Sequence, residues 1–194
     1  MRVWAGRLCI VWALIGCATP SPVPVYFGPV VANGIPIGGG RILTAFHVAE
    51  TSRAAVMCKA KPVELAVILL PSVSGEDASY RIAEASPPPG AEVTLRFWLN
   101  GFSVTRTGTV LGPAKNSVLF SAFIAHNGAD PAAFYITSSP VPEGASGSPV
   151  YLNGEIVGMT VISNTAPNVW MSAHVRPEKM REFLKGCPRG NGPH

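Results

Sequence analysis

Two residues of this chain could together carry out nucleophilic chemistry, a serine between glycines and a histidine after an apolar segment. Ser146 lies in the sequence Glu-Gly-Ala-Ser-Gly-Ser-Pro-Val (143–150), and His47 follows Leu-Thr-Ala-Phe (43–46). Glycines near a serine let the backbone turn sharply, so that amide N–H groups can converge on a developing oxyanion. Histidine is the usual base for a nucleophilic hydroxyl group. The two segments therefore predict acyl-transfer chemistry.

Both segments resemble those of the trypsin-like serine peptidases, which have the chymotrypsin fold. In that family the histidine ends a hydrophobic-Leu-Thr-Ala-x-His segment, and the serine lies in Gly-x-Ser-Gly-x-Pro. Here Ser148 stands where glycine is commonest, and Ala145 precedes the nucleophile. Digestive relatives carry an aspartate at the latter position, which pairs with a new N-terminus after zymogen cleavage. That switch is expected to be absent, as in the bacterial HtrA/DegP-like branch, which the overall pattern resembles most.

The resemblance implies a role for each of these residues. Ser146 would be the nucleophile, His47 the general acid and base, and the N–H groups of Gly144 and Ser146 the oxyanion hole. Of the four histidines, only His47 lies in such a motif. The implied activity is that of a serine endopeptidase, which hydrolyses peptide or protein substrates through an acyl-enzyme intermediate and needs no metal or organic cofactor.

The third member of such a triad holds the imidazole of His47 in one tautomer, and two positions compete for it. Glu64 opens the segment Glu-Leu-Ala-Val-Ile-Leu-Leu (64–70), which resembles the family's Asp-Leu-Ala-Val-Leu with glutamate for aspartate. Asp77 precedes Ala-Ser-Tyr-Arg-Ile (78–82), which is a poorer local match.

The number of strands favours Asp77. The fold implied by the resemblance needs two strands between histidine and acid, and residues 54–59 and 63–70 would supply them. Choosing Glu64 leaves one strand too few, and Asp130 lies in the second half of the chain, where the fold does not place the acid. We therefore predict Asp77 as the triad acid and keep Glu64 as the alternative.

The sequence gives few signals of substrate preference. Alignment with the family places Pro140 near the base of the S1 pocket, Met159 and Thr160 on one wall and Asn168 on another. None of them is acidic, so a preference for Lys or Arg is not supported. A small or medium apolar P1 side chain is predicted instead, because a pocket without a buried charge cannot offset the desolvation of a charged group.

The remaining sequence predicts an all-β protein of two packed, six-stranded antiparallel barrels with a short C-terminal helix. Hydrophobic residues make up 47% of the 194 residues and charged residues only 13%, with 20 Gly and 19 Pro, a composition typical of short buried strands and tight turns. Turns are expected at pairs such as Asn33-Gly34, Asn100-Gly101 and Asn153-Gly154. The helix is expected over 177–185. Strands are expected over 25–32, 40–48, 54–59, 63–70, 79–85, 92–98, 102–111, 117–125, 133–138, 148–152, 155–162 and 169–175.

The N-terminus resembles an export signal. Arg2 and Arg7 precede or flank a short apolar core (8–15), whose length suits a signal peptide rather than a spanning helix of about 20 residues. The segment Leu-Ile-Gly-Cys (14–17) resembles the bacterial lipobox, which implies that Cys17 becomes lipidated. The alternative is an ordinary cleaved signal in which Cys17 is incidental.

These features predict a domain division and a location. The expected parts are a signal peptide (1–16), a Pro-rich tether (17–24), the protease domain (25–185) and a flexible tail (186–194). The protein would be exported to the cell envelope, facing the periplasm or the exterior, with a lipid anchor as its only contact with the membrane. The sequence does not indicate an oligomeric state.

Charge and the remaining cysteines give weaker signals. The net charge is +4, or +2 once Arg2 and Arg7 are removed, which is too little to predict nucleic-acid binding. Cys58 and Cys187 form an even pair in an exported chain, so they are either a disulfide or two unrelated buried thiols. Their spacing does not fit a zinc site.

Three other functions remain open at this stage. The chain could be a catalytically silent binding module of the same fold, or a structural lipoprotein of the envelope in which Gly-x-Ser-Gly is coincidental. It could also be a phage or viral processing protease, although such a protein would be expected to lack an export signal.

Overall fold

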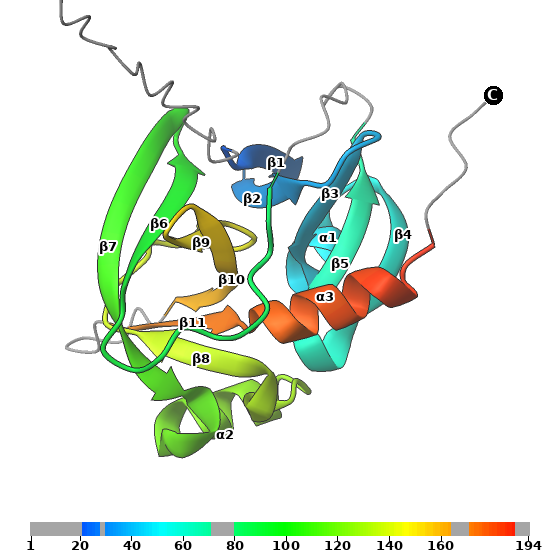
Figure 1. The fold of residues 1–194 in the computed structure, drawn as a ribbon. Coiled ribbons are helices and arrows are strands. Elements are labelled where there is room, and N and C mark those ends of the chain that lie inside the picture. Colours follow the sequence, from blue (N-terminus) through cyan, green and yellow to red (C-terminus); the bar gives the residue numbers. More distant parts are fainter. Residues whose placement is uncertain (1–20, 28–29, 71–79, 164–170, 189–194) are drawn as a thin grey trace, which may run out of the picture.

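The computed structural model describes residues 21–27, 30–70, 80–163 and 171–188 of the chain. These residues form a five-stranded antiparallel sheet followed by a closed six-stranded antiparallel barrel, with three short α-helices (Figure 1). The all-β, chymotrypsin-like architecture predicted from the sequence is confirmed.

The N-terminal sheet has the strand order β1-β2-β3-β5-β4. Buried and exposed residues do not alternate along β3 and β5, because both faces of these two strands are covered. The described strands are β1 (Val23–Phe27), β2 (Val30–Pro36), β3 (Arg41–Ala45), β4 (Ala55–Ala60) and β5 (Leu65–Leu69). The predicted strand over 25–32 is therefore two strands, joined between Phe27 and Val30.

The barrel closes in the order β10-β11-β8-β7-β6-β9. Two of its hairpins turn at Asn100-Gly101 and Asn153-Gly154, where all four residues have positive φ, as type I′ turns require. Both turns were predicted. The strands are β6 (Glu92–Leu99), β7 (Phe102–Pro113), β8 (Phe134–Thr137), β9 (Pro149–Leu152), β10 (Glu155–Ser163) and β11 (Ser172–Val175).

Two predicted strands of the first half are not strands of that sheet. Residues 92–98 form β6 and belong to the barrel, where β6 pairs with β7 and β9. The described part of 79–85 contributes only an isolated parallel bridge between Ile82 and Ile156. The N-terminal sheet consequently has five strands rather than six among the described residues.

The predicted strand over 117–125 is a helix, α2 (Val118–His126). Ser117 caps it, because its hydroxyl accepts a hydrogen bond from the N–H of Phe120. The two buried residues of α2 are Phe120 and Ile124, which are four apart and share one helical face. The run Val-Leu-Phe-Ser-Ala-Phe-Ile-Ala is apolar throughout, so its composition did not distinguish a strand from a helix.

The remaining helices complete the fold. They are α1 (Phe46–Thr51), α3 (Pro177–Gly186) and the short 3-10 turns η1 (Lys61–Val63), η2 (Ala114–Asn116) and η3 (Pro131–Ala133). The predicted C-terminal helix is thus confirmed. No helix among the described residues is both long enough and apolar enough to cross a membrane.

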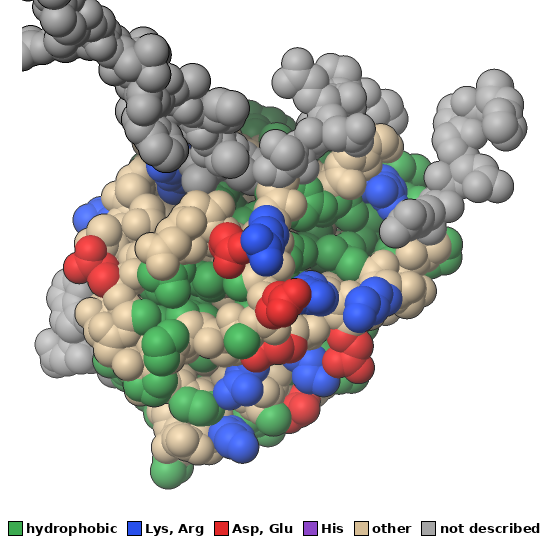
Figure 2. Space-filling model, viewed as in Figure 1, with side chains coloured by type: hydrophobic (Ala, Val, Ile, Leu, Met, Phe, Trp, Pro, Cys, Tyr) green, Lys and Arg blue, Asp and Glu red, His purple; other side chains and the backbone are tan. Residues whose placement is uncertain are grey.

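Helix α3, near the C-terminus, packs against the N-terminal sheet. Met180 is fully buried in the core cluster that also contains Leu43 and Val67 of the sheet. A disulfide links Cys58 of β4 to Cys187, directly after the helix. The outer face of α3 carries charged side chains of both signs (Figure 2), including the ion pair of Lys179 with Glu182. The disulfide alternative left open by the sequence is therefore the correct one.

The ends of the domain differ slightly from the predicted division. Strand β1 begins at Val23, so the last two residues of the predicted tether pair with β2. Cys187 is disulfide-bonded, so the predicted tail over 186–194 does not begin at residue 186. The predicted signal peptide and the predicted lipidation site, Cys17, lie outside the described residues and stay predictions.

Candidate active site

His47 lies on α1, the six-residue helix that follows β3, and not at the end of the strand. Val48 and Ala49 are buried and fix the helix on the core. The N–H of Phe46 donates to the carbonyl of Glu64 at 3.0 Å, which ties the start of the helix to the turn before β5. The imidazole of His47 is half exposed and faces a cavity of about 500 Å³.

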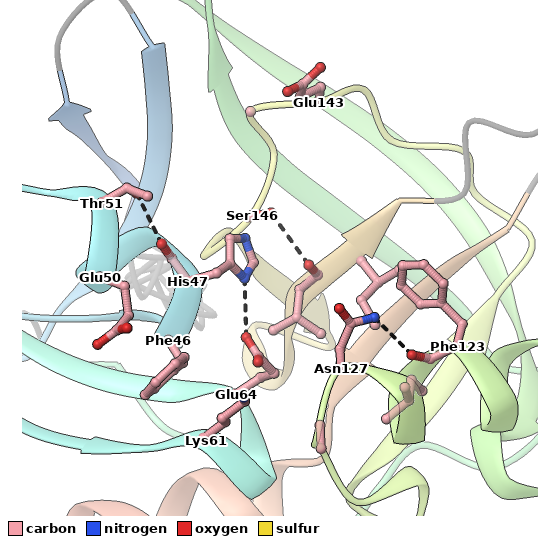
Figure 3. A pocket seen from close by; sticks show the side chains of 15 residues that line it. Phe46, His47, Glu50, Thr51, Lys61, Glu64, Phe123, Asn127, Glu143 and Ser146 are labelled. Atoms are coloured by element: carbon pink, nitrogen blue, oxygen red, sulfur yellow. Dashed lines mark hydrogen bonds and ion pairs between the residues drawn. The ribbon is translucent and has the colours of Figure 1, made fainter.

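The carboxylate of Glu64 lies at Nδ1 of this imidazole. The Nδ1–Oε2 distance is 3.1 Å, and the Glu64 side chain is largely buried (Figure 3). Glu64 ends η1 in the left-handed region, with φ 55° and ψ 38°, a conformation that is uncommon for a residue other than glycine. A carboxylate at Nδ1 favours the tautomer with hydrogen on Nδ1, which leaves the Nε2 lone pair free to accept a proton.

Ser146 lines the same cavity as His47 and Glu64, so the structure brings these three residues together (Figure 3). The Ser146 hydroxyl donates to the carbonyl of Val161 on β10 at 3.4 Å, rather than to His47. Hydrogen bonds between catalytic groups are often long or misaligned before substrate binds, and a serine hydroxyl can rotate freely.

The backbone around Ser146 directs its carbonyls away from the cavity. The Gly144 carbonyl accepts from Asn33 Nδ2 at 2.8 Å, and the Ser146 carbonyl accepts from Asn33 N–H at 2.8 Å. The carbonyl between them, on Ala145, accepts from Ser148 N–H at 3.1 Å. The N–H groups of Gly144 and Ser146 make no hydrogen bond within the described part of the chain. Two free donors are thus left on the loop that carries the serine.

Gly147 must be a glycine for a steric reason. A Cβ at this position would lie 1.8 Å from the carbonyl oxygen of Asn33, and the residue has φ 84°. Its N–H donates to the carbonyl of Thr160 at 2.7 Å. The glycine after the serine therefore lets the loop pack directly against β2 and β10.

Charged side chains of both signs line one side of the cavity, and apolar side chains line the other. Phe123 and Ile124 of α2 form much of the apolar side, together with Val161 and Ile162 of β10. The other lining residues are Phe46, His47, Glu50, Thr51, Lys61, Glu64, Asn127, Ala129, Glu143, Gly144 and Ser146.

The residues predicted for the S1 pocket do not line this cavity. Met159 and Thr160 are buried behind it, and the lining on β10 starts with Val161. Pro140 is exposed and lies outside the lining, and Asn168 falls outside the described residues. Asp77, the predicted acid, also falls outside the described residues, so its role stays a prediction.

A buried histidine lies behind the nucleophile loop. His174 on β11 is fully buried, with Nε2 at 2.9 Å from the hydroxyls of Thr137 and Ser172, and Nδ1 at 3.2 Å from that of Thr160. Ser172 Oγ donates to the carbonyl of Ser139, so it accepts from His174 Nε2–H. Desolvation by burial lowers the pKa of His174 from 6.5 to about 3, which keeps the ring neutral.

The sequence missed three contributors to this site. Asn33 was expected in a turn, but it is fully buried inside β2 and bonds to the loop of Ser146. Phe123 was placed on a strand, and His174 was assigned no role. None of these three residues lies in a segment with a local signal, because they act through contacts between distant segments. Among the described residues, no group of His, Cys, Asp and Glu is arranged to hold a metal ion.

Solved structures of serine proteases share this fold. The chain is similar to Rv3671c from M. tuberculosis H37Rv, solved as an inactive serine-to-alanine mutant, with TM-score 0.66 and 18% identity over 97% of this chain and 99% of that chain. The active form of the Rv3671c protease gives TM-score 0.62 and 17% identity, over 84% of this chain and 77% of that chain.

The serine endoprotease from Yersinia pestis gives TM-score 0.68 and 17% identity, over 88% of this chain and 63% of that chain. No protein-family model matches the chain, and no curated protein matches it. At these identities the likeness shows the chymotrypsin-like fold and leaves the activity to be argued from the site.

Proposed function

We propose that this protein is a serine endopeptidase whose triad is Ser146, His47 and Glu64. The observation that carries the proposal is the Glu64 carboxylate at 3.1 Å from His47 Nδ1, beside a cavity that Ser146 shares. The fold of known serine proteases supports it. Glu64 takes the place that strand counting gave to Asp77, because a carboxylate already satisfies Nδ1.

The chemistry follows from the orientation of each group. His47 Nε2 accepts the proton of Ser146 Oγ as this oxygen attacks the carbonyl carbon of the peptide bond. The resulting oxyanion is stabilised by the free N–H groups of Gly144 and Ser146. Nε2–H then protonates the leaving amine as the C–N bond breaks, and Glu64 stabilises the transient imidazolium. A water molecule, deprotonated by His47, hydrolyses the acyl-enzyme ester and returns Ser146 to its starting state.

The cavity favours substrates with a bulky apolar side chain near the scissile bond. Phe123 is 51% exposed although it is aromatic, and it lines the cavity from α2. Burying such a ring against an apolar side chain of the substrate removes both surfaces from water. This proposal keeps the apolar character predicted from the sequence but replaces the small or medium P1 side chain with a bulky one, and it rests on α2 and β10 rather than on the residues first assigned to S1.

A fluorophosphonate probe tests the proposed activity. Such a probe should label the wild-type protein at Ser146, and Ser146→Ala should lose both labelling and peptide hydrolysis while keeping its thermal unfolding midpoint. Ser103→Ala, at an exposed position on β7, is the matched control and should be labelled normally. A folded wild-type protein that resists labelling would support the catalytically silent binding module instead.

The proposed location at the cell envelope depends on the N-terminal segment. If Cys17 is lipidated, the mature chain starts at this residue and partitions with membranes. Mass spectrometry of the mature N-terminus decides the question. A soluble, unmodified chain that starts downstream of Cys17 would show an ordinary secretory signal.

A further inference from the structure

Asn33 connects the nucleophile loop to three strands. Its side chain is fully buried, with Nδ2 at 2.8 Å from the Gly144 carbonyl and at 3.2 Å from the Trp98 carbonyl on β6. Oδ1 accepts from Trp98 N–H at 2.6 Å. The backbone of Asn33 adds the hydrogen bond from its N–H to the Ser146 carbonyl, and its own carbonyl accepts from Thr44 Oγ1 of β3 at 2.7 Å.

We propose that Asn33 is a positioning residue that holds the loop of Gly144 and Ser146 in the conformation presenting its two free N–H groups to the substrate. This inference rests on the proposed function, because an oxyanion hole has a role only if Ser146 attacks a carbonyl group. It assigns a role in the reaction to a strand residue that does not line the cavity.

The geometry of the loop explains why it needs an external support. Gly144 has φ 92°, and a glycine can adopt alternative conformations at little cost. Peptide units are planar, so fixing the carbonyls of Gly144 and Ser146 limits rotation of the Ala145–Ser146 peptide between them. That peptide carries the Ser146 N–H. Asn33 contacts both flanking carbonyls and so restrains the donor without touching it.

The side chain of the residue before the serine gives the loop no polar support. Ala145 is fully buried in the apolar cluster inside the barrel, and its methyl group can form neither an ion pair nor a hydrogen bond. The polar side-chain restraint on the Gly144 carbonyl comes instead from the neighbouring sheet, through Asn33. This restraint is intramolecular and built into the fold, so the loop is held without any cleavage of the chain.

Only an amide of this size satisfies the three partners. Nδ2 donates to two carbonyls while Oδ1 accepts from an N–H, so a reversed amide would place oxygen against both carbonyls. Aspartate has the same shape but would lose the donor and set a negative charge against these carbonyls. Alanine would remove all three side-chain hydrogen bonds and leave the Gly144 carbonyl without its partner.

The test compares Asn33→Ala and Asn33→Asp with a variant of the same region that leaves the side chain of Asn33 intact. Thr44→Val removes the hydrogen bond to the Asn33 carbonyl and none of the hydrogen bonds of the loop. We expect both Asn33 variants to lower kcat about 100-fold, the effect of losing one oxyanion donor, with KM changed only a few-fold. Thr44→Val should lower the unfolding midpoint but leave kcat within a few-fold.

A second measurement separates positioning from general destabilisation. A peptide aldehyde forms a tetrahedral adduct with Ser146, whereas the matching peptide alcohol cannot. The Asn33 variants should lose aldehyde affinity by the same factor as kcat and bind the alcohol as the wild type does. Equal losses for both ligands, or an equal fall of kcat in Thr44→Val, would show a purely structural role and overturn the inference.

The outcome also separates this inference from the proposed function. A wild-type protein that is labelled and active, with Asn33 variants equally active, overturns only the positioning role. A folded wild-type protein without labelling or hydrolysis overturns both. If Asn33→Ala does not fold, Asn33→Asp, which keeps the acceptor for Trp98 N–H, decides between the outcomes.

Discussion

The carboxylate of Glu64 lies 3.1 Å from Nδ1 of His47, and only one strand, β4, separates the two residues in the chain. Two local features let these side chains meet although so few residues separate them in the chain. His47 is on a helical turn after β3, and Glu64 occupies a left-handed position at the end of η1. The side chains consequently meet where α1 packs on the turn before β5.

Glu64→Gln should therefore lower kcat/KM steeply, by about 10⁴-fold. The amide could donate to Nδ1 and would then stabilise the tautomer with hydrogen on Nε2, which cannot accept the Ser146 proton. Steady-state hydrolysis of a peptide substrate measures the effect. Asp77→Asn is the matched control and should change the rate only a few-fold; the opposite ranking would give the triad to Asp77.

Phe123→Ala should weaken the use of substrates with bulky apolar side chains. The loss of the ring removes apolar surface from the cavity, so KM for such peptides should rise about 10-fold or more while polar peptides are affected less. Phe102→Ala is the control, because Phe102 is 74% exposed on β7 and lies outside the lining. Equal effects of the two substitutions on all substrates would exclude a role for α2 in selection.

The sequence predicted the parts of the site that depend on local backbone geometry. The glycines near Ser146 and the segment before His47 carry their own signal, because a sharp turn and a buried strand restrict the residue types that fit. The proposed acid, Glu64, was harder to predict, since its position depends on how β4, η1 and β5 connect. The segment after Glu64 resembles that of the family, but its left-handed backbone, which lets the side chain reach His47 after one strand, has no sequence signature.

Asn33 shows why the remainder could not be predicted. An Asn-Gly pair favours a turn, but here it lies within β2, because the side chain bonds to β6 and the Ser146 loop. Gly34 fits the same strand for a packing reason, since a Cβ there would lie 2.2 Å from Ile42 Cγ2. Tertiary contacts override the local preference at both positions, and such contacts are not visible along the sequence.

Reduction of the Cys58–Cys187 disulfide should destabilise the folded protein. The bond closes a loop with a sequence separation of 129 residues, and disulfides that close long loops typically contribute about 2–5 kcal/mol. Urea unfolding with and without a reductant measures the loss. Cys58→Ala/Cys187→Ala should match the reduced wild type, and an unchanged midpoint in both cases would contradict the prediction.

The buried His174 should make the protein sensitive to acid below about pH 6.5. Its pKa is lowered from 6.5 to about 3 by desolvation, so the unfolded chain binds a proton that the folded chain does not. As far as His174 is concerned, the free energy of unfolding is therefore highest above the unfolded pKa. It falls as the pH drops from about 6.5 toward about 3, by at most about 1.4 kcal/mol per pH unit.

The window between pH 7 and pH 5 isolates this histidine from Glu178. Burial acts to raise the pKa of Glu178, but hydrogen bonds from its own backbone and from Ser86 outweigh it and lower the pKa below 4.5. The stability that the ionised Glu178 contributes is therefore lost only at more acidic pH, below its unfolded pKa.

His174→Gln removes the titrating group and keeps polar atoms near Thr137 and Thr160. Its urea midpoint should be lower than that of the wild type at pH 7, but should fall less between pH 7 and pH 5. Parallel pH profiles for the two proteins would show that His174 does not control acid stability.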